Sequence, residues 1–588
     1  MSKIDWIVLC ATLLLILTYG LYKSRTSKNL EGYFLSNRSM PWYLVLLSIM
    51  GTQASAITFL SAPGQAFTDG MRFVQYYFGL PLAMIVISVS FVPLFNKLKV
   101  FTAYEFLEQR FDLKTRILTS TLFLLSRGLS TGISIYAPSL ILSSLMGWDI
   151  FWTNIFMGGL LIIYTVSGGA RAVAYTQQLQ LLIIFGGMFI AGYYVVHYLP
   201  EGVGFSDALR VSGASGKLNI ITTGVSEKGF DWKDRYNIIS GVIGGFFLAL
   251  SYFGTDQSQV GRYLTAKDNT QSRLGLLMNG LVKVPMQFFI LLLGTLLFSY
   301  YQFNPGPVFF NQSVADKAMK TSYAPQLKQL DSSYQILQVQ QKKNSLAFVD
   351  KQDDATRVVF QNTRQTMDSL QKEYKTVLKK AVPASDTNDT NYIFLRFVVD
   401  HLPAGLVGLL IAIIFLAAWG SIAAALNSQA ACTVVDFHIR LRGKQHDVNQ
   451  LEASAKEYRV SKYYTLAWGI FSIITAELAT GMGSLIEAVN VLGSLFYGVI
   501  LGIFLVALYF KKIGGTAIFR AAILGEIFVV ACFLLDKWGY IGLGFLWLNA
   551  VGALVVVVLA HLFDWIKPEE KKVLPIAAET RAEADNNQ

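Results

Sequence analysis

The chain has 588 residues, of which 53% are hydrophobic and only 15% are charged, and its formal net charge is +11. An ordinary soluble domain carries about 25% charged residues. This composition therefore excludes an ordinary soluble protein. The basic residues gather in short loops between apolar runs, which is typical of membrane topology and argues against a nucleic-acid partner.

About 13 apolar segments are long enough to be membrane-spanning helices, because about 20 apolar residues cross a bilayer and a span must satisfy its backbone internally. In chain order the predicted spans are 4–22, 41–67, 74–96, 117–145, 150–168, 174–198, 236–262, 275–301, 393–436, 461–480, 485–510, 516–535 and 541–564. We interpret the first as a retained span rather than a signal peptide, because it is too long for an h-region and lacks a small-residue cleavage site.

Lys and Arg recur in every second connection, beginning with Lys23, Arg25, Lys28 and Arg38 after the first span. Basic loops face the cytoplasm. We therefore expect a multi-pass protein of the cell (inner) membrane, with the N-terminus outside and the C-terminus in the cytoplasm.

Two polar segments divide the chain into a transmembrane part at 1–302, an insertion at 303–392, a second transmembrane part at 393–565 and a tail at 566–588. The insertion has about 90 residues, longer than an ordinary loop, and its amphipathic patterns predict helices. The topology places it outside, where it is a candidate for binding an extracytoplasmic partner. The tail has the composition of a disordered cytoplasmic segment.

The stretch GTQASAITFLSAPGQAF at 51–67 interrupts an apolar run with Gly, Thr, Gln and Ser. Small residues in a membrane helix often serve close packing. Here the polar groups crowd at mid-span, which indicates a broken helix whose freed carbonyls coordinate Na⁺. A second such helix, 417–436, offers the Ser421 hydroxyl in an alanine-rich stretch.

Four charged residues fall inside predicted spans: Arg127, Lys283, Glu487 and Glu526. Intramembrane charge costs at least about 2.5 kcal/mol, so each is a functional candidate. For two of them a non-functional alternative stays open. Arg127 could snorkel toward a nearby surface. Lys283 could pair structurally with an acidic neighbour rather than contact the solute.

Common hydrolase and nucleotide-binding motifs are absent, and the three cysteines lie far apart without metal-ligand spacing. We expect no enzyme and no cofactor, with Na⁺ as a coupling ion. A membrane sensor or receptor on the same fold is the alternative, although the tail is too short for a signalling domain.

Several segments together resemble the solute:sodium symporter family, nearest the branch of sodium/iodide, monocarboxylate and multivitamin transporters. They are GYFLSNRSMPWY (32–43), SAITFLSAPGQAF (55–67), TGISIYAPSLILSSLMGWDIF (131–151), YTVSGGARAVAYTQQLQ (164–180), GTDQSQVGRYLTAKD (254–268) and ALNSQAACTVVD (425–436). The resemblance implies an all-α membrane protein with two inverted five-helix repeats, like the bacterial leucine transporter. One extra helix leads the repeats, and about two trail them.

The resemblance also implies a function, which is sodium-coupled import of a small organic solute or anion by alternating access. Carried over residue by residue, it places the shared sodium site at Gly51, Ala54, Ala417, Gly420 and Ser421. This sequence departs from the family at Gly420, where a second hydroxyl residue is usual. It departs again at Gln177, where members that bind an additional sodium carry aspartate, so we expect one sodium per cycle.

For the solute, the resemblance implies pocket or gating roles for Gln53, Thr58, Tyr76, Tyr77 and Tyr252, and a pocket-side position for Lys283. The glutamine and asparagine with which the galactose-transporting member binds its sugar are replaced by Ala249 and Val489. That difference argues against simple hexose recognition and leaves the solute open.

Overall fold

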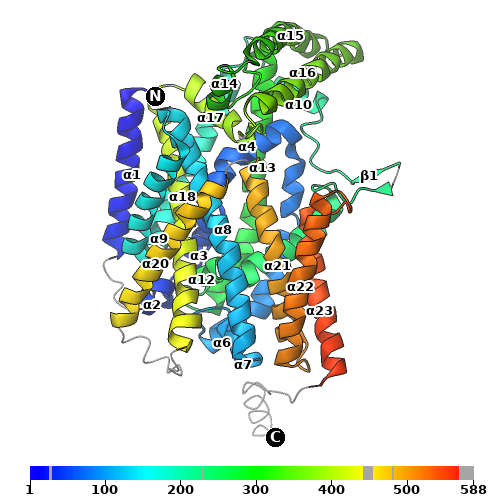
Figure 1. Cartoon of the computed structure of the whole chain (residues 1–588). Coiled ribbons are helices and arrows are strands. Elements are labelled where there is room, and N and C mark those ends of the chain that lie inside the picture. Colours follow the sequence, from blue (N-terminus) through cyan, green and yellow to red (C-terminus); the bar gives the residue numbers. More distant parts are fainter. Residues whose placement is uncertain (25–29, 228, 384, 442–454, 480–481, 569–588) are drawn as a thin grey trace.

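The computed structural model describes residues 1–24, 30–227, 229–383, 385–441, 455–479 and 482–568. Long helices lie side by side as one bundle, and a group of helices covers one of its ends (Figure 1). We name this group, α14–α16, the cap, and the end of the bundle that carries it the cap end. The N-terminus lies at the cap end (Figure 1).

Nine helical segments among the described residues are long and apolar enough to cross a membrane, and each overlaps a predicted span. They are Lys3–Gly20, Met71–Leu98, Leu113–Met146, Ala172–His197, Asn269–Phe303, Leu406–Ile439, Leu485–Tyr509, Gly515–Lys537 and Phe545–Ile566. The pair Trp42–Gln53 and Ala56–Asp69, bent by 62°, makes a tenth, broken span. Two predicted spans coincide with the shorter apolar helices Ile150–Val166 and Ser240–Gly254, and the segment 461–480 falls on α20 and η6.

The first half of the chain supplies the elements α1 to α10. Their bounds are α1 Lys3–Ser24, α2 Leu30–Leu35, η1 Ser36–Arg38, α3 Trp42–Gln53, α4 Ala56–Asp69, η2 Met71–Tyr77, α5 Leu80–Val86, η3 Ile87–Phe91, α6 Val92–Leu98, α7 Glu105–Arg110, α8 Leu113–Met146, α9 Ile150–His197 and α10 Phe205–Ala214. The break between α3 and α4 falls at Ala54 and Ser55, within the stretch that the sequence marked as a broken helix.

Helix α9 has 48 residues and contains the predicted span 150–168 and all but the last residue of the predicted span 174–198. A straight helix of that length would measure about 72 Å, more than twice the thickness of a bilayer core. The Tyr164 and Thr176 hydroxyls nevertheless lie 2.6 Å apart, whereas residues 12 apart in a straight helix are separated by about 18 Å. The chain therefore turns back between these two residues, and α9 makes two crossings.

The second half begins with a small antiparallel hairpin, β1 Val225–Ser226 and β2 Gly229–Phe230. The helices after it are η4 Ser240–Gly244, α11 Gly245–Gly254, α12 Gln257–Tyr263, α13 Asn269–Phe303, α17 Thr390–His401, α18 Leu406–Cys432, η5 Thr433–Ile439, α20 Ala455–Ala476, η6 Glu477–Ala479, α21 Leu485–Tyr509, α22 Gly515–Lys537 and α23 Phe545–Ile566. Like α3 and α4, helices α11 and α12 are two halves of a helix broken in its middle, here at Thr255 and Asp256.

The predicted span 393–436 proves to be two helices. Helix α17 ends at His401, and α18 begins after Pro403 and Gly405, which has a φ of 91°. Proline lacks the backbone donor that a continuous helix needs, and a positive φ favours glycine. The membrane-crossing part therefore starts at Leu406.

Inside the predicted insertion, the cap consists of α14 Gln312–Ala318, α15 Ala324–Lys351 and α16 Asp354–Ala381. Helices α15 and α16 pack as a hairpin with their own small apolar core. The hairpin also contacts the bundle, because Gln361 donates to the Ala214 carbonyl (2.6 Å) and Phe348 and Phe360 join the main core. The predicted tail from residue 569 onward lies outside the described residues.

Candidate functional site

The break between α3 and α4 leaves two carbonyl groups without their helical donors. In a continuous helix, the Ser55 and Thr58 N–H groups would donate to the Gly51 and Ala54 carbonyls. Instead, Ser55 N–H donates to the Gln53 carbonyl and Thr58 N–H to the Ser55 carbonyl, both over 3.0 Å. The oxygens of Gly51 and Ala54, which the sequence assigned to a sodium site, are thus free of these bonds.

Helix α18 packs against both halves of the broken helix and brings the predicted residues Ala417, Gly420 and Ser421 to this region. The Ser421 hydroxyl donates to its own helix, at the carbonyls of Ala417 and Ala418 (3.1 Å each). A hydroxyl oxygen that donates in this way keeps its lone pairs available for a cation.

Gln177 on α9 lies between α3 and α18. Its amide nitrogen donates to the Gly420 carbonyl (3.1 Å), and its amide oxygen accepts from Ser48 (2.9 Å). A Cβ added at Gly51 would lie 2.9 Å from Gln177 Cγ, and one at Gly420 would lie 2.7 Å from Gln180 Oε1. A side chain at position 51 would therefore collide with the base of the Gln177 side chain, whereas one at position 420 would displace the end of the Gln180 side chain.

A central cavity of about 100 Å³ lies beside the break. Five residues that the sequence proposed for the solute or for gating line it: Gln53, Thr58, Tyr76, Tyr77 and Tyr252. Ala249 and Val489 line it as well, together with Ser55, Asn490, Tyr497 and Arg127.

Lys283 does not line the cavity. It is fully buried on α13, and its Nζ lies 5.7 Å from the centre of the Tyr77 ring. No hydrogen-bond partner of Nζ occurs among the described residues, so the predicted acidic partner is not found within them. Lys283 therefore lies behind a residue of the cavity wall.

Arg127 is not a snorkelling residue. Its side chain is only 12% exposed, and Nη2 lies 2.6 Å from the carboxylate of Asp256. The snorkelling interpretation is wrong because the guanidinium turns inward to the broken helix α11–α12, where its Cζ also lies 5.4 Å from the Tyr252 ring centre. Its Nε–H donates no hydrogen bond to any of the described residues.

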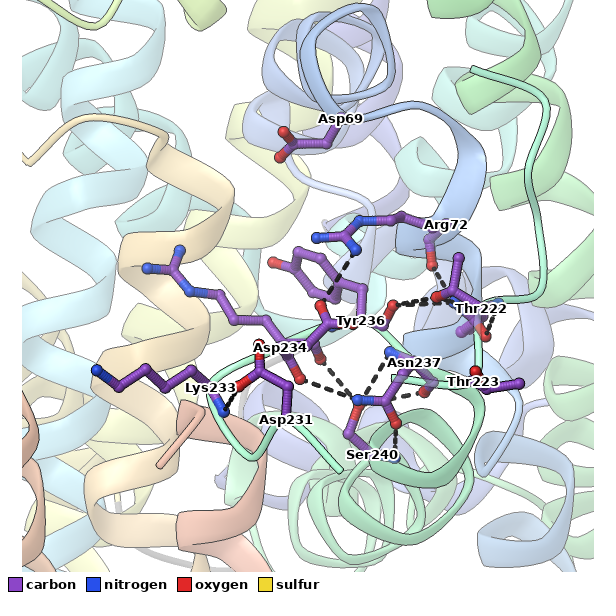
Figure 2. A network of polar contacts seen from close by, with 12 residues as sticks. Asp69, Arg72, Thr222, Thr223, Asp231, Lys233, Asp234, Tyr236, Asn237 and Ser240 are labelled. Carbon is purple, nitrogen blue, oxygen red and sulfur yellow. Dashed lines mark hydrogen bonds and ion pairs between the residues drawn. The ribbon is translucent and has the colours of Figure 1, made fainter. Parts of the chain in front are cut away.

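A charged cleft lies at the cap end, lined by Asp69, Arg72, Asp231, Lys233, Asp234, Arg235, Tyr236 and Glu487. Figure 2 shows side chains of the segment that precedes η4, among them Asp234 and Tyr236, near Arg72. Arg72 pairs with Asp234 (3.1 Å), and Thr222 Oγ1 donates to the Tyr236 carbonyl (2.9 Å).

Helix α21 is tied to this end of the bundle through one of its faces. Residues 484, 487 and 490 are spaced by three and so share a face. Ser484 donates to Gln65 (3.0 Å), and Glu487 accepts from Arg235 (2.6 Å) and Tyr236 (3.1 Å). Tyr76 donates to Asn490 (3.0 Å). Glu487 thus belongs to the cap-end cleft.

Glu526, the fourth predicted intramembrane charge, lies on α22. Its carboxyl oxygens are buried without a hydrogen-bond partner among the described residues. It is not a lining residue of the central cavity.

A bundle with two broken helices, freed carbonyls at one break and a polar cavity beside it is the architecture of a secondary transporter. A family model described as the sodium:solute symporter family matches residues 33–322 and 371–525. The chain belongs to this family.

Two curated relatives are informative. The chain is 25% identical over 562 residues to the sodium/sialic acid symporter SiaT of Proteus mirabilis, covering 94% of this chain and 93% of that protein. It is 30% identical over 256 residues to the human sodium/iodide cotransporter, covering 43% of this chain and 38% of that protein.

The fold is also that of a solved structure, a Na⁺-coupled sialic acid symporter in a substrate-bound outward-open state. The TM-score is 0.73 with 24% identity, and the match covers 97% of this chain and 99% of that one. The all-α, inverted five-plus-five helix repeat expected from the resemblance is confirmed.

The protein is therefore a multi-pass membrane transporter that couples a small solute to sodium, and not an enzyme. Sodium is the coupling ion. The family match supports transport, the first of the two functions that the sequence had left open.

Sequence reasoning did not assign Asp256, Asn490 or Tyr497 to the site, although all three lie on or next to the cavity. Asp256 had a detectable signal, since it follows Gly254 and Thr255 at a helix break. Asn490 and Tyr497 carried none, because single polar or aromatic residues in a mostly apolar span are common and the sequence does not show which of them face a cavity.

Proposed function

We propose that the protein imports a small organic carboxylate together with one sodium ion across the cell (inner) membrane. The observation that carries this proposal is Arg127. Among the described residues that line the central cavity, it has the only charged side chain. A buried guanidinium recognises carboxylate geometry better than any other side chain, because its planar fork donates paired hydrogen bonds.

The size of the cavity supports a small solute. Pockets for drug-sized ligands measure about 300–1,000 Å³, whereas this one measures about 100 Å³. A short monocarboxylate fits that volume better than a sugar acid. Two types of relative are named for a carboxylate solute, the sialic acid symporters and the sodium-coupled monocarboxylate transporters.

The sodium ion would bind between the Gly51 and Ala54 carbonyls of the broken helix and Ala417, Gly420 and Ser421 of α18. Oxygen ligands without a fixed charge suit Na⁺ in a membrane interior. The freed carbonyls at the α3–α4 break support this assignment. Gln177 supports a single ion, because a neutral amide offers no fixed negative charge to a second cation.

We propose that the cap end faces outward, so that the N-terminus is outside and the C-terminus in the cytoplasm. The shared location of the N-terminus and the cap at one end supports this orientation (Figure 1), together with the basic loops. A binding partner for the 303–392 insertion stays a prediction from the sequence.

Purified protein in proteoliposomes tests the proposal. An inward sodium gradient should drive accumulation of labelled pyruvate or propionate, whereas galactose should not accumulate. Replacement of sodium by choline should stop the uptake. Sodium-driven uptake of iodide or N-acetylneuraminate, with none of either monocarboxylate, would contradict the choice of solute, and uptake unchanged in choline would contradict the coupling.

A further inference from the structure

We infer that Arg127 changes partners during transport, leaving Asp256 for the carboxylate of the solute, and that Asp256 thereby links solute binding to opening of the passage away from the cap. This inference rests on the proposed carboxylate solute. It adds Asp256, which does not line the cavity, as a positioning residue of the transporter.

The ion pair between Arg127 and Asp256 lies on the side of the cavity away from the cap. Helix η4 begins at Ser240, shortly after the cap-end residues Arg235 and Tyr236, and continues into α11, which runs past the cavity to Gly254. Asp256 follows at the break, on the side of the cavity away from the cap. Arg127 lies between the cavity and Asp256, because it lines the cavity and its Nη2 donates to the Asp256 carboxylate (2.6 Å).

The ion pair between Arg127 and Asp256 connects two helices. Arg127 belongs to α8, and Asp256 begins α12. Within the described residues, α8 and α12 have little other contact. Nη2 of Arg127 also lies 2.5 Å from Ser258 Oγ on the first turn of α12. The guanidinium is therefore the main polar connection between α8 and the start of α12.

Asp256 keeps other hydrogen-bond partners when the guanidinium of Arg127 leaves it. Its Oδ2 accepts from the Tyr497 hydroxyl (3.0 Å). Its Oδ1 accepts from the backbone N–H (2.8 Å) and the hydroxyl (2.6 Å) of Ser258. These three donors keep the buried carboxylate hydrogen-bonded, which avoids the large cost of an unsatisfied charge.

Arg127 remains paired with a carboxylate before and after the exchange. A solute carboxylate replaces the Asp256 carboxylate as the anionic partner, so no buried cation is left alone at any stage. A solute without a negative charge does not compete for the guanidinium. The exchange therefore makes separation of the start of α12 from α8 depend on a carboxylate in the cavity.

Two measurements on full-length protein in nanodiscs and proteoliposomes test the inference: the half-saturating concentration of pyruvate, and amide hydrogen exchange of residues 256–263. In the wild-type protein, pyruvate with sodium should speed the exchange of this segment, and galactose should not. In Asp256→Asn the segment should exchange fast without pyruvate. Its half-saturating pyruvate concentration should fall about tenfold, because Arg127 is no longer held by a carboxylate.

A second variant covers the case in which Asp256→Asn does not fold. Tyr497→Phe removes one competing donor, so Asp256 should hold Arg127 more tightly. We expect a half-saturating pyruvate concentration raised several-fold and slower exchange of 256–263 with pyruvate. Tyr509→Phe is the matched control on the same helix, because its hydroxyl lies 2.7 Å from Ser90 far from the pair, and it should behave as wild type.

The Tyr497→Phe effect should disappear in the Asp256→Asn background, since coupled residues are not additive. An unchanged exchange rate and unchanged pyruvate affinity in Asp256→Asn would overturn the inference. An additive double variant would overturn it too. If wild-type protein takes up neither pyruvate nor propionate, the proposed solute class itself fails, which is a different result from pyruvate uptake that ignores Asp256.

Discussion

The side-chain amide of Gln177 donates a hydrogen bond to the backbone carbonyl of Gly420 over 3.1 Å. The same nitrogen lies 3.3 Å from Thr52 Oγ1. Gln177 thereby connects α9 to α3 and α18, at the position where the family resemblance implies an aspartate in members that bind an additional sodium. Because Gln177 is a neutral amide, it offers no fixed negative charge to a second cation.

Gln177→Asp should therefore create a second sodium site. The wild-type protein is expected to move one sodium per solute, and the variant two, with a Hill coefficient for sodium that rises clearly above one. Without sodium, the buried aspartate would tend to be protonated, because burial disfavours its charged form. Counting charge per labelled pyruvate in proteoliposomes measures the ratio.

Gln178→Asp is the matched control, because this half-buried neighbour points in another direction on the same helix. It should leave the ratio at one. Two sodium ions per solute in the unmodified protein would contradict the role given to Gln177.

Ser421→Ala should weaken sodium binding without changing the solute. A hydrogen-bonding group that meets a charge contributes about 1.5–3 kcal/mol, so the half-saturating sodium concentration should rise by at least about tenfold. Ser428→Ala is the control: it lies two turns further along α18, and its hydroxyl donates to the Ala425 carbonyl of its own helix (2.7 Å) and to no other group among the described residues. Equal sodium dependence in both variants would remove Ser421 from the site.

Lys283→Met separates function from stability. Burying an ammonium group without a partner is costly, so an apolar side chain of similar length should raise the melting temperature. If Lys283 acts on the solute through Tyr77, the same variant should reduce saturable pyruvate uptake. A more stable protein with normal uptake would show that Lys283 has no part in transport, and a destabilised one that it has a structural partner.

Lys217 predicts a pH dependence of folding stability outside the membrane. It donates to the Thr68 carbonyl, and its Nζ lies 5.1 Å from the Phe298 ring centre. Burial, with a contribution from the nearby Arg364, lowers the pKa of Lys217 to about 8, although Asp368 and Asp69 oppose the shift. An unfolded lysine titrates near 10.4.

Between pH 8 and 10.4 the unfolded chain binds a proton that folded Lys217 has released, so stability should rise with pH across this window. The gain is at most about 3 kcal/mol. Melting temperatures in detergent between pH 7 and 10 measure it, with Lys217→Met as the comparison in which this contribution is absent. A wild-type stability that follows the variant over the whole range would show that Lys217 titrates normally.

The sequence by itself determined the features that depend on local patterns. Long apolar runs specify spans because a bilayer leaves the backbone no other partner. The crowding of Gly51, Thr52, Gln53 and Ser55 specified a broken helix, because such residues weaken a helix wherever they stand. The polar, amphipathic composition of 303–392 likewise indicated helices outside the membrane.

Only the tertiary structure decided which side chains meet. Arg127 and Asp256 are 129 positions apart, and no local pattern distinguishes an arginine that snorkels from one that pairs across the bundle. Lys283 looked like a cavity residue, but packing places it behind Tyr77. Periodicity reports which face of a helix is apolar, whereas the partner of a buried polar group depends on how distant helices cross, and that depends on the packing of the whole bundle.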